Sequence, residues 1–168
     1  VHELPPNGSG LVALMALADG ALSTMLRSFA KGGVELAQNR VPKMLAEEEY
    51  HASLGSAWYR RLAATEGEAR ALLTSASEEM LPALLAWVGA DDASARAMVD
   101  AGVIDPAEDR LAAFRNAVRD LVSLVGINVD AVHAATDWDE ARGRTGGRPD
   151  EEACERARGD RNRALLVE

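Results

Sequence analysis

The sequence predicts an all-α protein, a helical bundle of four or more helices with an extended C-terminal tail. Its apolar residues are mainly alanine and leucine, which favour helices, whereas aromatic residues make up only 4% of the chain. Apolar residues recur at steps of three and four, and no segment alternates as a half-buried strand would. We therefore expect a helical domain over residues 1–135 and a polar tail over residues 136–168.

The first two expected helices form a hairpin around a glycine turn. One begins near Leu11 and ends near Gly32 and Gly33, and the other covers residues 34–64, where Pro42 would kink it or mark its effective start. The apolar positions of the first are Leu11, Met15, Ala18, Leu22, Leu26 and Phe29. Those of the second are Val41, Met44, Leu45, Ala52, Gly55, Trp58, Tyr59 and Leu62.

Further helical segments are expected over residues 66–88, 93–101 and 106–126. Pro82 would bend or split the first of these, whereas Pro106 suits the first turn of the last. From Thr136 onward the chain is polar and rich in glycine. We expect Trp138 and the apolar run at residues 164–167 to dock this tail onto the bundle.

The charge and the single cysteine exclude several classes of protein. With 27 acidic and 18 basic side chains, the net charge of −9 argues against binding to nucleic acid or to an anionic membrane surface. Cys154 is alone and cannot form an intrachain disulfide, which favours a reducing compartment. No apolar run reaches the roughly 20 residues that span a bilayer. We expect a soluble, cytoplasmic protein.

Two polar residues lie within the apolar face of the second helix. Glu48 and His51 are three residues apart and can reach a common point, whereas Glu47 and Glu49 point to either side and are best explained as solvated. On the first helix, Asp19 stands among leucine and methionine residues, where an unpartnered carboxylate is costly or stays protonated. All three candidates therefore face the interior.

The glycine turn places these candidates at one height, because Asp19 and Glu48 are equally far from it along an antiparallel hairpin. Carboxylate oxygens and an imidazole nitrogen suit a first-row divalent metal, and iron or manganese is usual in helical bundles. The sequence thus predicts Asp19, Glu48 and His51 as metal ligands. The alternative is a Glu-x-x-His that occurs by chance, with His51 bonded to a carbonyl in the core.

The run P-x-M-L-x-E-E-x-Y-H-x-x-x-G at residues 42–55, preceded by L-A-D at 17–19, resembles the phenylacetic acid catabolic family. The resemblance covers about residues 11–85. It implies a ferritin-like bundle and a subunit of the multicomponent oxygenase that epoxidises phenylacetyl-CoA. It also implies a di-iron cofactor that activates dioxygen, and it maps Asp19, Glu48 and His51 onto one half of the ligand set.

The family's site takes an acid and a Glu-x-x-His from each of two helix pairs, but this sequence contains one such set. Three explanations are open: the sequence is a fragment, two copies share one site about a two-fold axis, or the chain is a structural subunit whose partner does the chemistry. The expected partners are further copies or related ferritin-like subunits, a reductase component and a small aromatic acyl-CoA or similar substrate. Whether the chain is an enzyme, a non-catalytic subunit or a metal-storage or interaction protein stays open.

Overall fold

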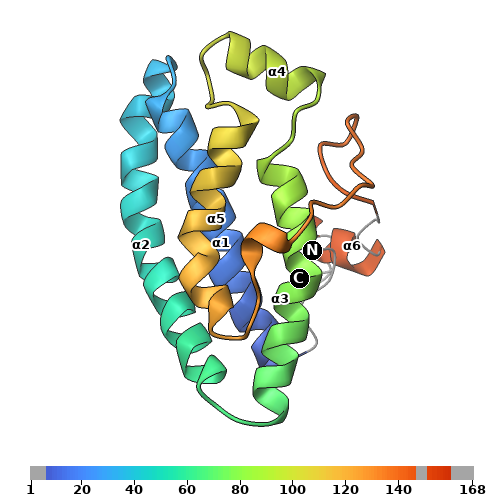
Figure 1. Ribbon diagram of the computed structural model, residues 1–168. Coiled ribbons are helices and arrows are strands. Elements are labelled where there is room, and N and C mark those ends of the chain that lie inside the picture. Colours follow the sequence, from blue (N-terminus) through green and yellow to red (C-terminus); the bar gives the residue numbers. More distant parts are fainter. Residues whose placement is uncertain (1–6, 147–150, 160–168) are drawn as a thin grey trace, which may run out of the picture.

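The computed structural model describes residues 7–146 and 151–159, and these fold as a helical bundle (Figure 1). The long helices are α1 (Gly8–Lys31), α2 (Glu35–Ala63), α3 (Glu68–Val88) and α5 (Ala107–Ser123). The short ones are α4 (Ala93–Asp100), the 3-10 helix η1 (Val129–Ala131) and α6 (Glu151–Arg158). Over these residues no strand forms beyond an isolated bridge between Asp139 and Arg144. The all-α prediction is confirmed.

The hairpin turn between α1 and α2 depends on glycine. The Gly33 amide donates a hydrogen bond to the carbonyl of Gly102, 2.7 Å away in the loop after α4. A Cβ atom at Gly32 would overlap the carbonyl oxygen of Val103 in the same loop. A side chain at position 32 would therefore displace this loop, which explains the glycine at that position.

Both internal prolines lie within continuous helices. The helix α2 begins at Glu35, so Pro42 does not mark its start, and α3 is not split at Pro82. A proline lacks the amide hydrogen of one helical bond, but the surrounding packing holds the helix together. The sequence also allows a kink in α2 at Pro42 and a bend in α3 at Pro82, and these two stay predictions.

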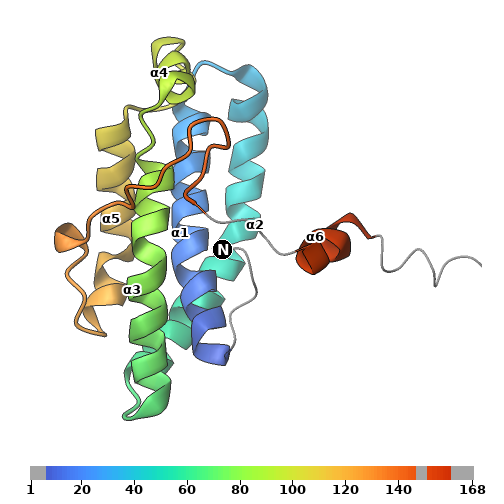
Figure 2. The same ribbon diagram turned by 90° about the vertical axis from the view of Figure 1, so that its right-hand side faces the viewer.

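The central helix of the bundle is α1, which packs against α2, α3 and α5. Figure 2 shows α1 between α3 and α2, with α2 at the edge of the bundle. Two hydrophobic clusters fill the interior, and both include residues of α1, α3 and α5. The aromatic and leucine side chains among them are Leu17, Tyr59, Leu73, Leu81, Leu85, Phe114 and Leu121.

The buried face of α1 differs from the predicted one. Its buried residues are mostly small: Ser9, Gly10, Ala13, Ala16, Leu17, Ala21, Ser23, Thr24 and Ser28. The predicted apolar positions Leu11 and Leu22 are instead 45% and 39% exposed. The reason is that a helix surrounded by three others needs small side chains for close approach, so its larger residues face outward. On α2, Val41, Gly55 and Tyr59 are buried as expected, but Met44 and Trp58 are exposed.

Judged by length and composition alone, α1 is the one helix in the described part of the chain that could cross a membrane. The core helix of a soluble protein passes the same test, and α1 is packed inside the bundle. However, only 44% of its most apolar stretch is buried. Much of the apolar surface of α1 therefore faces outward.

The tail docks where the sequence predicts. The indole Nε1 of Trp138 donates a hydrogen bond to Oδ2 of Asp92, 3.1 Å away. The tail is not extended throughout, because Glu151–Arg158 forms α6. The second predicted docking run, at residues 164–167, lies outside the described residues.

Candidate metal centre

A close contact between α1 and α2 positions the three candidate ligands. A Cβ atom at Gly55 would lie 3.2 Å from the backbone nitrogen of Ala16, so the two backbones nearly touch there. His51 stands one helical turn before Gly55, and Asp19 stands about one turn after Ala16 on the neighbouring helix. The glycine contact thus holds the two polar segments side by side.

Glu48 and His51 form a loose pair on α2. Nδ1 of His51 lies 3.4 Å from Oε2 of Glu48, near the outer limit of a hydrogen bond. The side chain of Glu48 is 23% exposed, whereas that of His51 is 63% exposed. His51 therefore stands at the outer edge of the hairpin, which contradicts the prediction that it faces the interior. The cause is the position of α2 at the edge of the bundle, where one side of the helix is uncovered.

Asp19 lies within electrostatic range of both residues. Burial raises the pKa of its carboxyl group, the negative charge of Glu48 raises this pKa further, and His51 acts in the opposite direction. Within the described residues the side chain of Asp19 forms no hydrogen bond. The structure thus brings the three predicted residues together, and it leaves the Asp19 carboxylate without the partners that an acid in such a position usually has.

Among the described residues of one copy, these three side chains do not form a group that could hold a metal ion. Over residues 7–146 and 151–159, no three histidine, cysteine, aspartate or glutamate side chains converge closely enough to do so. The donors are of the right kind, since carboxylate and imidazole groups bind iron and manganese. The number and the spacing of these donors are insufficient to coordinate a metal ion. The outward position of His51 is part of the reason.

A second polar cluster joins α5 to the end of α3 and to the loops on either side of α4, and it was not predicted. The Arg110 side chain is buried, and its guanidinium donates to the carbonyls of Val88 at 2.8 Å, Ala90 at 2.6 Å and Asp105 at 2.8 Å. A signal was present in the sequence: Arg110 precedes Phe114 by four residues and so lies on the apolar face of α5. Its role is structural, because all its partners are backbone carbonyls that end helices or line loops.

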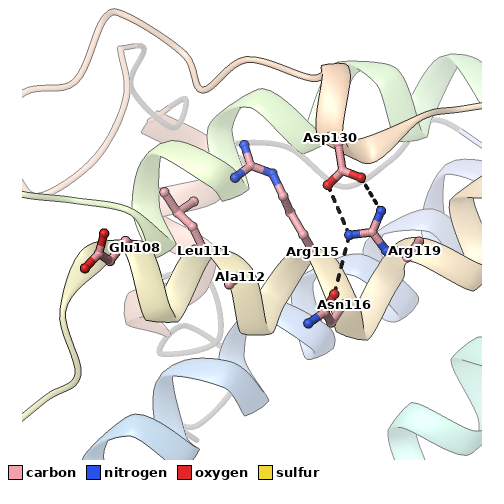
Figure 3. A pocket seen from close by; sticks show the side chains of 7 residues that line it. All are labelled: Glu108, Leu111, Ala112, Arg115, Asn116, Arg119 and Asp130. Atoms are coloured by element: carbon pink, nitrogen blue, oxygen red, sulfur yellow. Dashed lines mark hydrogen bonds and ion pairs between the residues drawn. The ribbon is translucent and has the colours of Figure 1, made fainter.

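A shallow cavity of about 330 Å³ lies along α5 (Figure 3). The guanidinium of Arg119 there is paired with the carboxylate of Asp130 from η1. Nε of Arg115 is buried and has no hydrogen-bond partner among the described residues. The cavity is lined by residues between 108 and 130 and includes none of the three candidate ligands.

An all-α bundle whose central hairpin carries two carboxylates and an imidazole is the arrangement expected of the ferritin-like class. The family model described as phenylacetic acid catabolic protein matches residues 10–158. This chain belongs to that family. No curated protein matches it significantly.

Proposed function

We propose that this chain is an oxygenase subunit in phenylacetic acid catabolism, acting in the cytoplasm on an aromatic acyl-CoA or a similar compound. The family supports the general role. The observation that carries the proposal is the grouping of Asp19, Glu48 and His51 on the α1–α2 hairpin. Electron supply by a reductase component belongs to the same proposal and rests on the family alone.

The electrostatics of this group support a ligand role. Asp19 and Glu48 repel each other, and burial disfavours the charged form of Asp19. The repulsion and the burial of Asp19 both lower the stability of the fold, and a bound cation would relieve both effects. Perturbed carboxyl groups of this kind are concentrated at functional sites.

The proposed cofactor is iron, with manganese as the second choice. The described residues of a single copy do not complete a ligand set. We therefore assign the activation of dioxygen to an assembled form and not to the isolated chain. Asp19, Glu48 and His51 would supply this chain's share of the ligands.

Iron analysis of the purified protein tests the proposal. Wild-type protein should retain iron, and His51→Ala should lose most of it. His133→Ala is a matched control, because His133 is also exposed but stands apart from the candidate group. Equal iron in wild type and His51→Ala would rule out His51 as a ligand.

A non-catalytic assembly subunit is the second candidate function. It is favoured by the 63% exposure of the His51 side chain and by the lack of a complete ligand set among the residues that the structure describes. In that case, His51→Ala should leave both iron content and the turnover of the assembled complex unchanged. The same substitution therefore separates the two functions.

A further inference from the structure

The cavity along α5 is a candidate binding site that lies apart from the α1–α2 hairpin. One side of α5 forms its floor, where Leu111, Arg115 and Arg119 follow one another at steps of four residues. Asp130 of η1 stands opposite this side of the helix (Figure 3). Residues of two elements thus line a space of about 330 Å³, near the lower end of the range for small-molecule sites.

One of the two arginines in this cavity is already paired. The guanidinium of Arg119 contacts both carboxylate oxygens of Asp130 and also lies 3.4 Å from Oδ1 of Asn116. The hydrogen bond from Arg119 is the largest cause of the lowered pKa of Asp130, and the charge of Arg115 is the smallest. Asp130 therefore belongs to Arg119, and the two charges balance within the protein.

Arg115 has no such partner. Among the described residues its guanidinium forms neither an ion pair nor a hydrogen bond, and its Nε is buried (Figure 3). Nε is the one nitrogen of this side chain that is both buried and unpartnered, so the terminal Nη groups stay open to the cavity. Because an arginine keeps its charge in proteins, Arg115 places a partly desolvated, unbalanced positive charge at the cavity.

The other acid of the cavity lies too far along α5 to neutralise this charge. Glu108 stands seven residues before Arg115, which is roughly 10 Å along the helix axis. It belongs to the first turn of α5, where a negative charge is favourable because of the helix dipole. A bound anion would therefore meet one free guanidinium and no acid directly beside it.

The charges and the walls of the cavity favour a small acid with one negative charge. Arg115 balances one charge, whereas a ligand with two would be repelled by Asp130 and Glu108. The planar guanidinium matches the two oxygens of a carboxylate, and such paired hydrogen bonds are among the strong ones. Leu111 and Ala112 supply an apolar part of the wall.

We propose that the cavity along α5 binds a small monocarboxylic acid, with the carboxylate on the Nη groups of Arg115 and the apolar part against Leu111 and Ala112. The amide nitrogen of Asn116 is a second donor, since Arg119 engages its Oδ1. The site includes none of the candidate metal ligands and does not depend on the proposed function.

The test adds benzoate to the full-length protein at constant ionic strength and follows the amide and arginine Nε resonances by nuclear magnetic resonance. Wild type should show saturable shifts centred on α5, with a dissociation constant on the order of 1–10 mM for so small a ligand. Benzamide, which is neutral and has the same shape, should cause no such shifts. Inorganic phosphate should bind more weakly than benzoate because it carries more charge.

Two variants locate the binding. Arg115→Gln should abolish it, whereas the control Arg40→Gln, at an exposed position on α2, should bind benzoate like wild type. Ala112→Leu keeps Arg115 but fills the cavity with a larger side chain, and it should also abolish binding. Circular dichroism should show equal helix content in all four proteins.

The absence of saturable shifts with benzoate, or equal shifts with benzamide, would overturn the site. Unchanged binding in Ala112→Leu or in folded Arg115→Gln would do the same, and Ala112→Leu decides the matter if Arg115→Gln does not fold. Tighter binding of phosphate than of benzoate would overturn the assignment to a singly charged carboxylate. These outcomes are separate from the iron content that tests the proposed function.

Discussion

Asp19 and Asp92 are two aspartates in sheltered positions with opposite surroundings. Oδ1 of Asp92 accepts from the Ala95 amide at 2.8 Å, and Oδ2 accepts from Trp138 Nε1 at 3.1 Å. The hydrogen bond from Ala95 is the largest cause of the lowered pKa of Asp92, followed by that from Trp138. Burial and Glu48 instead raise the pKa of Asp19, whose side chain has no hydrogen bond among the described residues.

This difference separates a part of the molecule that serves the fold from a part available for function. At the junction of α3, α4 and α5, the polar groups of Asp92 and Arg110 are satisfied by backbone and side chains. On the α1–α2 hairpin, the acids repel each other and His51 is exposed. Natural sequences keep such local conflicts mainly where a ligand or partner resolves them.

The largest expected effect is the loss of Arg110. Arg110→Met should lower the free energy of unfolding by about 3–5 kcal/mol, because buried carbonyls of Val88 and Ala90 would lose their donor. Chemical denaturation measures the change. The control Arg40→Met, at an exposed position on α2, should change stability by less than about 0.5 kcal/mol. An equal loss of stability in Arg110→Met and Arg40→Met would contradict the structural role assigned to Arg110.

A smaller loss is expected at the contact that ties the hairpin to α3. The hydroxyl groups of Tyr59 and Ser77 are buried and 2.8 Å apart, and Ser77 also donates to the carbonyl of Leu73. Tyr59→Phe should cost about 1–2 kcal/mol, because it leaves the Ser77 hydroxyl with one partner fewer. A double-mutant cycle with Ser77→Ala checks this contact, and additive losses would show that the two groups do not interact.

Trp138→Phe should cost about 0.5–1.5 kcal/mol at neutral pH, because it removes one hydrogen bond to Asp92. The pKa of Asp92 is lowered in the folded state, so its stabilising contribution is present above the ordinary pKa and is lost as the pH falls through the lowered value. The difference between wild type and Trp138→Phe should therefore shrink in acid. Thermal melts at acidic and neutral pH measure this difference in stability. A difference that does not change with pH would contradict the stabilising hydrogen bond between Trp138 and Asp92.

The smallest effect has the opposite sign. The pKa of Asp19 is raised in the folded state. At a pH just above the ordinary pKa, the folded protein therefore binds more protons than the unfolded protein. The free energy of unfolding consequently falls as the pH rises through the raised pKa. Asp19→Asn should therefore stabilise the metal-free protein at neutral pH, by less than about 1 kcal/mol because Asp19 is only partly buried. The gain should vanish in acid. A loss of stability at neutral pH would show that Asp19 serves the fold.

The sequence predicts the helices well because local periodicity and turn residues determine them. The long helices begin and end within a few residues of the expected positions, and the glycine turn correctly places Asp19 beside Glu48. The buried face of α1 could not be predicted, because large apolar residues are normally assigned to the core. Only the packing of three helices around α1 reveals that its small residues face inward.

The proximity of the three candidate residues was predictable, but the completeness of a site was not. The Glu-x-x-His spacing and the apolar surroundings identify Glu48, His51 and Asp19. Periodicity alone places His51 within the apolar face, but α2 lies at the edge of the bundle and leaves His51 exposed. The spacing of residues along one chain also cannot show that the donors fail to converge, or that the surface beside them is apolar and uncovered.

The central claim is that Asp19 is retained for a metal ion and not for the fold. The most direct test compares the rise in melting temperature on adding manganese to wild type, Asp19→Asn and Asp92→Asn. A metal that binds only the folded protein raises its melting temperature. We predict a rise for wild type and Asp92→Asn and none for Asp19→Asn, whereas an equal response of all three proteins would contradict the claim.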